Sequence, residues 1–110
     1  MKLENNDGNK PITRGKLSLD PARRSCSWNG ESIELTRSEF EILRVLSSRS
    51  EIVKSRDELL DAIHGGMDTD TNDETINSHI KRIRQKFEKV DKGFSSIKTR
   101  YGSGYYFKGD

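Results

Sequence analysis

The sequence has few of the residues on which disulfide-rich, metal-binding and membrane proteins depend. Cys26 is the only cysteine, so no internal disulfide can form and no cysteine pair is spaced for a metal. We expect it to be a small buried or half-buried hydrophobic residue. No apolar run approaches the length of a membrane span, and residues 1–10 are polar where a signal peptide would be apolar. These absences predict a cytoplasmic protein.

Apolar residues are also scarce, at 30% of the 110 residues against 35% charged residues. This balance predicts one small domain whose core is formed by a few periodic segments. The net charge is only +2, but residues 72–110 carry nine Lys and Arg against five Asp and Glu. The excess positive charge favours a polyanion partner for the C-terminal half, although a solvated helix face explains the charge equally well.

The N-terminal third reads as a linker followed by a small sheet. Residues 1–14 are polar and predict a linker or disordered N-terminus, which leaves residues 15–110 as the domain. From Gly15 to Leu35, apolar and polar residues alternate around turn signals at Asp20-Pro21 and Asn29-Gly30. This pattern predicts an antiparallel sheet whose last arm carries Ile33 and Leu35.

Three helices and a hairpin are predicted after the sheet. Capping boxes begin at Thr36 and at Ser55, each with a glutamate three residues later. The third helix, about 73–89, carries one apolar stripe formed by Ile76, Ile80, Ile83 and Phe87. Residues 97–107 predict a final hairpin with its turn near the glycines at 102 and 104.

The face of the third helix opposite its stripe has the chemistry of a DNA reader. At about 100° per residue, this face carries Thr75, Ser78, Arg82 and Gln85, with His79 and Lys81 on its flanks. Short polar side chains allow close approach to base edges, and an arginine can donate two hydrogen bonds to guanine. Basic side chains on the flanks are predicted to reach phosphates, namely Lys81, Arg84 and Lys86. A short helix before this one completes a helix-turn-helix-like layout, and an ordinary basic surface helix is the alternative.

Other functions fit the residues less well. Asp68, Asp70 and Asn72 imitate the start of a calcium loop, but Asp73 and His79 stand where that loop needs glycine and glutamate. No nucleophile has a base beside it, so we expect no enzyme, no metal and no cofactor. A protein-binding face would carry exposed apolar anchors, and an RNA-binding sheet would carry stacking aromatics; neither is evident.

Four segments of the sequence resemble the OmpR/PhoB-type winged-helix output domain of bacterial response regulators. They are Leu35–Leu43, Ser55–Leu60, residues 73–87 and residues 97–107. The resemblance covers about residues 15–108. It implies an α+β fold, a winged helix-turn-helix with an N-terminal four-stranded antiparallel sheet, three helices and a C-terminal hairpin wing. It further implies sequence-specific binding of double-stranded DNA for transcription regulation within a phosphorylation-controlled two-component system.

The resemblance also implies roles for single residues. Base reading falls to Thr75, Ser78, His79 and Arg82. Contacts to the DNA backbone fall to Arg56, Lys81 and Arg84, and the position of Lys86 on the helix flank adds it to this set. The wing, about residues 97–107, contributes Thr99, Arg100, Tyr101 and Gly102 at the adjacent backbone or minor groove. Three positions depart from the family pattern: Glu74 and Tyr101 stand where many members carry arginine, and His64 where many carry tryptophan.

The implied partners extend beyond DNA. They are a second copy of the chain bound to promoter direct repeats, and RNA polymerase, touched through the loop of residues 65–72. A sensor histidine kinase would act through a receiver domain that these 110 residues do not contain.

Overall fold

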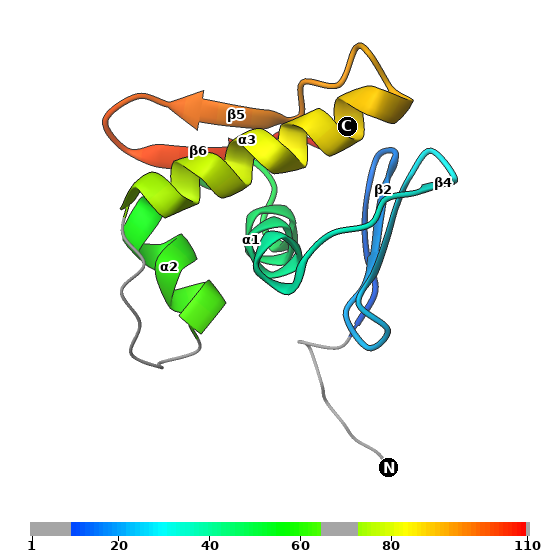
Figure 1. Cartoon of the computed structure of the whole chain (residues 1–110), viewed down its shortest axis with the longest axis horizontal. Helices are drawn as coiled ribbons and strands as arrows, with labels where there is room; N and C mark the ends of the chain where they lie inside the picture. Colours follow the sequence, from blue (N-terminus) through cyan, green and yellow to red (C-terminus); the bar gives the residue numbers. More distant parts are fainter. Residues whose placement is uncertain (1–9, 65–72, 110) are drawn as a thin grey trace.

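The structure is a computed structural model that describes residues 10–64 and 73–109, with side chains described at 10–63 and 76–109. In this part of the chain, a four-stranded antiparallel sheet is followed by three helices and a two-stranded hairpin (Figure 1). The predicted fold class is therefore confirmed. The elements are β1 (Ile12–Arg14), β2 (Leu17–Asp20), β3 (Ser25–Trp28), β4 (Glu31–Ser32), α1 (Arg37–Ser48), α2 (Arg56–His64), α3 (Asp73–Val90), β5 (Ile97–Arg100) and β6 (Gly104–Phe107).

The N-terminal sheet has strand order β1-β2-β3-β4, and its alternation separates a buried from an exposed face. Leu17 pairs with Trp28 and Leu19 pairs with Cys26, and all four side chains are buried. Cys26 is thus the buried residue that we predicted. Burial raises the pKa of its thiol to about 12, so that it stays protonated at neutral pH.

Two boundaries of the predicted sheet are wrong. Residues 12–14, assigned to the linker, form the edge strand β1, in which Thr13 pairs with Ser18. Ile12 gives this strand one side chain that packs against the core, too little for an alternation to be read. At the other end, β4 stops at Ser32, because the chain leaves the sheet toward α1; Ile33 is nevertheless buried.

The predicted capping boxes form at both helix starts. Thr36 Oγ1 accepts a hydrogen bond from the Glu39 amide at 3.2 Å, and Glu39 Oε1 accepts one from the Thr36 amide at 3.0 Å. Ser55 and Glu58 repeat this reciprocal pair at 3.1 and 2.7 Å. Each box satisfies two amides that have no partner inside the helix, which fixes where α1 and α2 begin.

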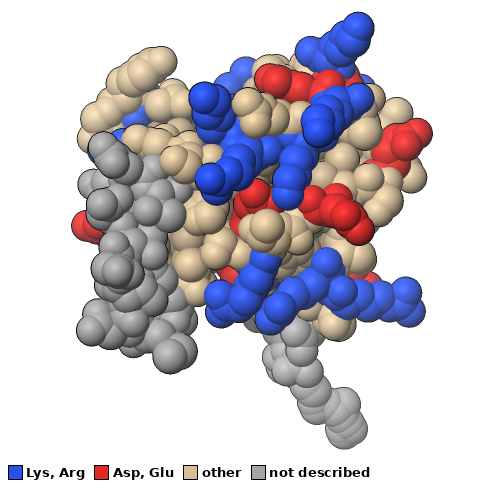
Figure 2. Space-filling model, in the orientation of Figure 1, with Lys and Arg blue, Asp and Glu red and all other residues tan. Residues whose placement is uncertain are grey.

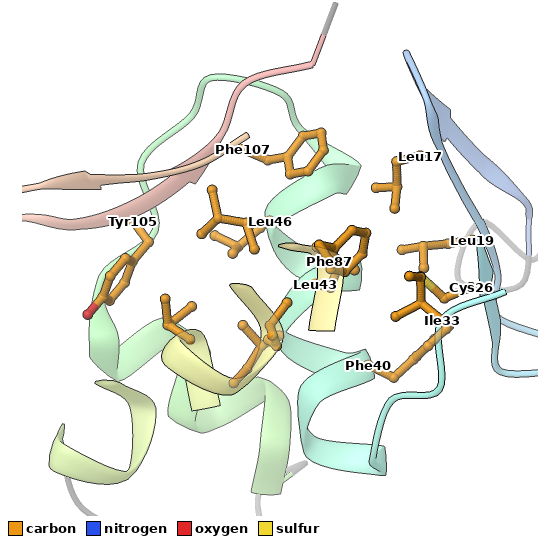
Figure 3. Close-up of a cluster of buried hydrophobic side chains, with 14 of the residues drawn as sticks. Leu17, Leu19, Cys26, Ile33, Phe40, Leu43, Leu46, Phe87, Tyr105 and Phe107 are labelled. Carbon is orange, nitrogen blue, oxygen red and sulfur yellow. The ribbon is translucent and has the colours of Figure 1, made fainter. Parts of the chain in front are cut away.

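The apolar stripe of α3 forms the centre of the core. Ile76, Ile80, Ile83 and Phe87 are each at most 1% exposed, as the helical spacing predicted. Leucines and Cys26 from the sheet lie on one side of Phe87, and the hairpin contributes Phe107 (Figure 3). Trp28 lies edge-on to Phe87 at 5.6 Å between ring centroids. These contacts hold the inner face of α3, so its opposite face is left to the surface.

The C-terminal hairpin is held to the rest of the domain at Lys54. The amide of Lys54 donates to the Tyr105 carbonyl at 2.7 Å, and the Tyr105 amide donates back at 3.0 Å. Gly104 beside this bridge has φ +142°, and a Cβ there would overlap the Lys54 carbonyl. Only glycine fits this approach. Among the described residues, no helix is long and apolar enough to cross a membrane.

Candidate nucleic-acid interface

The exposed face of α3 carries the residues that we predicted to lie there. Ser78, Lys81, Arg82 and Gln85 are exposed, opposite the buried stripe. Lys and Arg side chains gather over this helix in Figure 2. Thr75 belongs to the first turn of α3, but its side chain lies outside the described part of the chain, as do those of Glu74 and His64. The face therefore combines short polar side chains with positive charge along one helix.

Arg84 is turned away from this face, toward the hairpin. Its Nη2 donates to the Ile97 carbonyl at 2.8 Å and to Thr99 Oγ1 at 2.9 Å. Its guanidinium also lies 5.8 Å from the centroid of the Tyr105 ring. We had expected an outward side chain directed at a phosphate. The structure corrects this placement, since Arg84 lies at the edge of α3 where β5 offers a carbonyl and a hydroxyl acceptor.

Lys86 also differs from the prediction. Its Nζ lies 2.5 Å from Glu39 Oε1, and the Glu39 side chain is 2% exposed. Burial acts to raise the pKa of Glu39, but hydrogen bonds from Lys86 and the Thr36 backbone outweigh it, so the pKa lies below 4.5. Lys86 thus pairs with α1 in the structure, and its contact with a phosphate stays a prediction. Its charge neutralises a buried carboxylate of α1.

His79 lies half-buried between the two faces of α3. Its Nδ1 is buried and has no hydrogen-bond partner among the described residues. Burial lowers the pKa of His79 below 6.5, and the positive charge of Arg82 lowers it further against the opposing charge of Glu39. The imidazole is therefore mostly neutral at pH 7. It can exchange hydrogen bonds with a base edge but adds little charge for a phosphate.

A groove between α3 and the hairpin brings together residues that the sequence analysis predicted separately. The groove has a volume of about 360 Å³ and an apolar floor at Phe94 and Ile97. Its polar lining is Arg84, Glu88, Ser95, Lys98, Thr99 and Tyr101. Two cations, one carboxylate, hydroxyl groups and two aromatic rings thus line a groove beside the exposed face of α3, where the net positive charge and the hydroxyl groups suit a sugar-phosphate backbone.

The tip of the hairpin is a tight turn, as predicted. Gly102 has φ +84°, and the Ser103 amide donates to the Arg100 carbonyl at 2.9 Å. Tyr101 is 92% exposed at this tip. Arg56 is an exposed residue at the start of α2, two positions after Lys54, which pairs with Tyr105 of the hairpin. The loop 65–72 lies outside the described residues.

Sequence reasoning missed one polar contact that shapes the interface. The Tyr105 hydroxyl donates to Asn77 Oδ1, which ties the hairpin to the first half of α3. Asn77 itself is exposed beside Ser78, so its amide nitrogen remains on the surface. Tyr105 lies in the hairpin predicted over residues 97–107, and that pattern says nothing of a partner on α3. The two residues lie 28 positions apart, and no local pattern links them.

Comparisons with known proteins agree with this geometry. Residues 30–107 match the family model described as "Transcriptional regulatory protein, C terminal". The chain is 37% identical over 109 residues to the transcriptional regulatory protein BaeR of Escherichia coli O6:H1, covering 99% of this chain but only 43% of BaeR. It therefore spans less than half the length of this relative.

Two solved structures are similar over nearly the whole fold. The DNA-binding domain of Klebsiella pneumoniae RstA, solved in complex with the RstA box, is 30% identical with a TM-score of 0.74 and coverage of 90% of this chain and 97% of that one. The DNA-binding domain of Escherichia coli CpxR is 30% identical with a TM-score of 0.76, covering 91% and 97%.

Proposed function

Because the chain belongs to the OmpR/PhoB-type family of C-terminal domains of transcriptional regulatory proteins, we propose that it binds double-stranded DNA sequence-specifically and thereby regulates transcription. The exposed polar and basic face of α3 carries this proposal, since it stands free of the core beside a hairpin fixed to the same helix. A helix of this kind enters the major groove, and the hairpin then lies at the adjacent backbone or minor groove.

We assign base reading to Arg82 and Ser78, with Thr75 and the neutral His79 beside them. Arg82 is exposed about two turns beyond Thr75, and its fork suits guanine O6 and N7. Lys81 and Arg56 take the role of phosphate contacts. We further propose that Arg84 and Thr99, which form one wall of the groove between α3 and the hairpin, position the wing.

This chain matches less than half of its relative BaeR. We propose that it acts, like the corresponding part of such a relative, within a cytoplasmic response regulator. The chain covers 43% of BaeR, which leaves room in such relatives for the receiver domain on which a sensor histidine kinase would act. We propose that two copies bind head-to-tail on direct repeats, with half-sites about 10 base pairs apart. Contact with RNA polymerase through residues 65–72 belongs to the same proposal.

The experiment that tests this function is selection of bound duplexes from a random pool. The selected site is then compared with a shuffled duplex of equal length in affinity and stoichiometry. We expect a preference of at least about 10³-fold and two chains on a site with two repeats. Equal affinity for both duplexes would contradict sequence-specific binding. One chain per full site, bound as tightly as to a half-site, would contradict cooperative pairing alone.

A further inference from the structure

Tyr105 joins the hairpin to α3 through its side chain. Its ring lies at the end of the apolar cluster and is 7% exposed, with the hydroxyl directed outward (Figure 3). The hydroxyl donates a hydrogen bond to Asn77 Oδ1 in the first half of α3. Asn77 lies next to Ser78 and is exposed, and the sequence pattern gave it no role. The fold thus provides a partner for the oxygen of this amide and, among the described residues, none for its nitrogen.

The position of Tyr105 is fixed by its backbone and by its ring. Its backbone exchanges two hydrogen bonds with Lys54, at 2.7 and 3.0 Å. The guanidinium of Arg84 lies 5.8 Å from the centroid of its ring, and Arg84 is itself held by the Ile97 carbonyl at 2.8 Å. The phenol oxygen therefore has little freedom to move, and its proton reaches the Asn77 amide from a fixed direction.

The hydrogen bond from Tyr105 determines which end of the Asn77 amide faces outward. An amide carries an acceptor oxygen on one side and two N–H donors on the other. With Oδ1 turned to the phenol, Nδ2 lies on the exposed side of the group. Asn77 therefore presents a donor to any partner that lies against this part of α3. Because its oxygen is engaged by Tyr105, the amide is poorly suited to the paired hydrogen bonds by which asparagine reads adenine.

Asn77 lies on the edge of α3 that faces the hairpin. Asn77 and Arg84 are seven positions apart, which is about two helical turns, so they share one edge of the helix. Both contact the hairpin, Asn77 at Tyr105 and Arg84 at Thr99. In the proposed complex α3 occupies the major groove and the hairpin lies beside it, so a sugar-phosphate strand runs along this edge. Phosphate oxygens accept hydrogen bonds, and the charge of Arg84 attracts them.

We propose that Asn77 Nδ2 donates a hydrogen bond to a DNA phosphate between α3 and the hairpin, and that the Tyr105 hydroxyl positions the amide for this contact. The inference rests on the proposed function and adds to it a phosphate contact made by a neutral side chain. This contact strengthens binding to any sequence, because a phosphate carries no base information. It displaces no counterion, so it leaves the salt dependence of binding unchanged. The amide is oriented before DNA arrives, which reduces the entropy lost on binding.

The phosphate contact is tested with Asn77→Ala and Asn77→Asp on the selected site and on the shuffled duplex over a range of salt concentrations. Asn77→Ala should weaken binding to both duplexes about ten-fold, with the slope of log K against log salt unchanged. Asn77→Asp still accepts from the Tyr105 hydroxyl but replaces the donor by a carboxylate oxygen, so it should weaken both further. Wild-type affinity of Asn77→Ala, with Arg82→Ala still impaired, would overturn the inference and leave DNA binding intact. A loss on the selected site alone would overturn it too, because Asn77 would then read a base.

The positioning role of Tyr105 is tested by replacing single phosphates of the selected site with methylphosphonate, which removes the negative charge and one acceptor oxygen. In the wild type, one such replacement beside the hairpin should weaken binding about ten-fold, and Asn77→Ala should lose the response at that phosphate alone. Tyr105→Phe keeps the ring beside Arg84 but leaves the Asn77 amide free to turn. It should weaken binding about three-fold and reduce the response at the same phosphate. Tyr106→Phe, which removes a hydroxyl from the next position of β6, is the matched control and should behave as the wild type.

The outcomes separate the contact, its positioning and the proposed function. If Tyr105→Phe lowered affinity but kept the wild-type response at every phosphate, its hydroxyl would only stabilise the fold, and the positioning role would be overturned. Wild-type affinity and response of Tyr105→Phe would overturn that role as well. A wild-type response of Asn77→Ala at every phosphate would overturn the contact itself. Equal affinity of the wild type for the selected and shuffled duplexes would instead refute the proposed function.

Discussion

Lys86 Nζ of α3 lies 2.5 Å from Oε1 of Glu39, the buried residue that also closes the capping box of α1. One carboxylate thus accepts from the Thr36 amide and from a lysine of the recognition helix. The pair fixes α3 against the start of α1 and crosses 47 positions of sequence. It gives Lys86 a structural role that its position on the flank of α3 did not predict.

Replacing Lys86 should therefore destabilise the domain. Breaking a fully buried pair costs about 3 to 5 kcal/mol. Lys86 remains 32% exposed, so water can partly solvate the orphaned carboxylate. We expect Lys86→Ala to lower the free energy of unfolding by about 1 to 3 kcal/mol. Lys89→Ala, which removes an equal charge from an exposed position of α3, should change it by less than about 0.5 kcal/mol. Urea unfolding of both variants decides, and equal stability would show that the pair is energetically neutral.

The same carboxylate predicts how stability depends on pH. The pKa of Glu39 is lower in the folded state than its ordinary 4.5, so the unfolded chain binds the proton more readily. The stabilisation is complete above about pH 4.5 and is lost as the pH falls through the folded-state pKa. The pKa of Asp91 is lowered by hydrogen bonds from the Trp28 indole and the Gly93 amide, so this carboxylate contributes a loss of the same sign below pH 3.8.

Thermal unfolding between about pH 7 and pH 3 measures this dependence. Glu39→Gln should start less stable at neutral pH and decline less on acidification than the wild type. Asp91→Asn serves as the matched variant for the second carboxylate, since its indole hydrogen bond can be kept. Parallel curves for the wild type and both variants would mean that other carboxylates govern acid unfolding.

The two glycines of the hairpin turn should differ sharply when replaced. Gly104→Ala should cost about 3 kcal/mol or more, because its Cβ would overlap the Lys54 backbone. Gly102→Ala should cost about 1 kcal/mol, since φ is positive but the space around it is open. Thermal unfolding followed by circular dichroism compares the stability of the two variants. A Gly104→Ala variant as stable as Gly102→Ala would show that the hairpin can move away from Lys54.

Most helices and strands of the fold could be predicted from the spacing of apolar residues and from the helix-capping residues. The stripe through Ile80 and the two capping boxes depend on neighbours within four residues, which a linear pattern displays. Strand β1 was not predicted, because a strand of three residues with one side chain in the core is too short to show an alternation of apolar and polar residues. The edge of the domain was therefore placed too late.

The helical spacing also predicted which residues of α3 face away from the core, but not which residues at the edges of that face contact other elements. A helical angle separates Arg82 from Ile80, yet it does not say which element faces a residue at the edge of the stripe. Arg84 meets Ile97 of the hairpin and Lys86 meets Glu39 of α1, and both partners are set by tertiary packing. Two residues predicted to contact phosphates thus also make internal contacts, while Lys81 and Arg82 lie on the surface without a hydrogen bond or ion pair to another element among the described residues.

Arg82 and Lys81 are adjacent, exposed and equally charged, which makes them a matched pair for separating base reading from phosphate contact. Arg82→Ala should weaken binding to the selected site by about 1 to 3 kcal/mol and reduce discrimination at one base pair. Lys81→Ala should weaken the selected and shuffled duplexes by the same factor and lower the salt slope by about one. Neither variant should change the unfolding free energy by more than about 0.5 kcal/mol, since both side chains are exposed. If Arg82→Ala lowered both affinities equally, Arg82 would be a phosphate contact. Specificity would then have to come from Ser78, Thr75 or His79, whose neutral side chains can hydrogen-bond to base edges without adding to the salt slope.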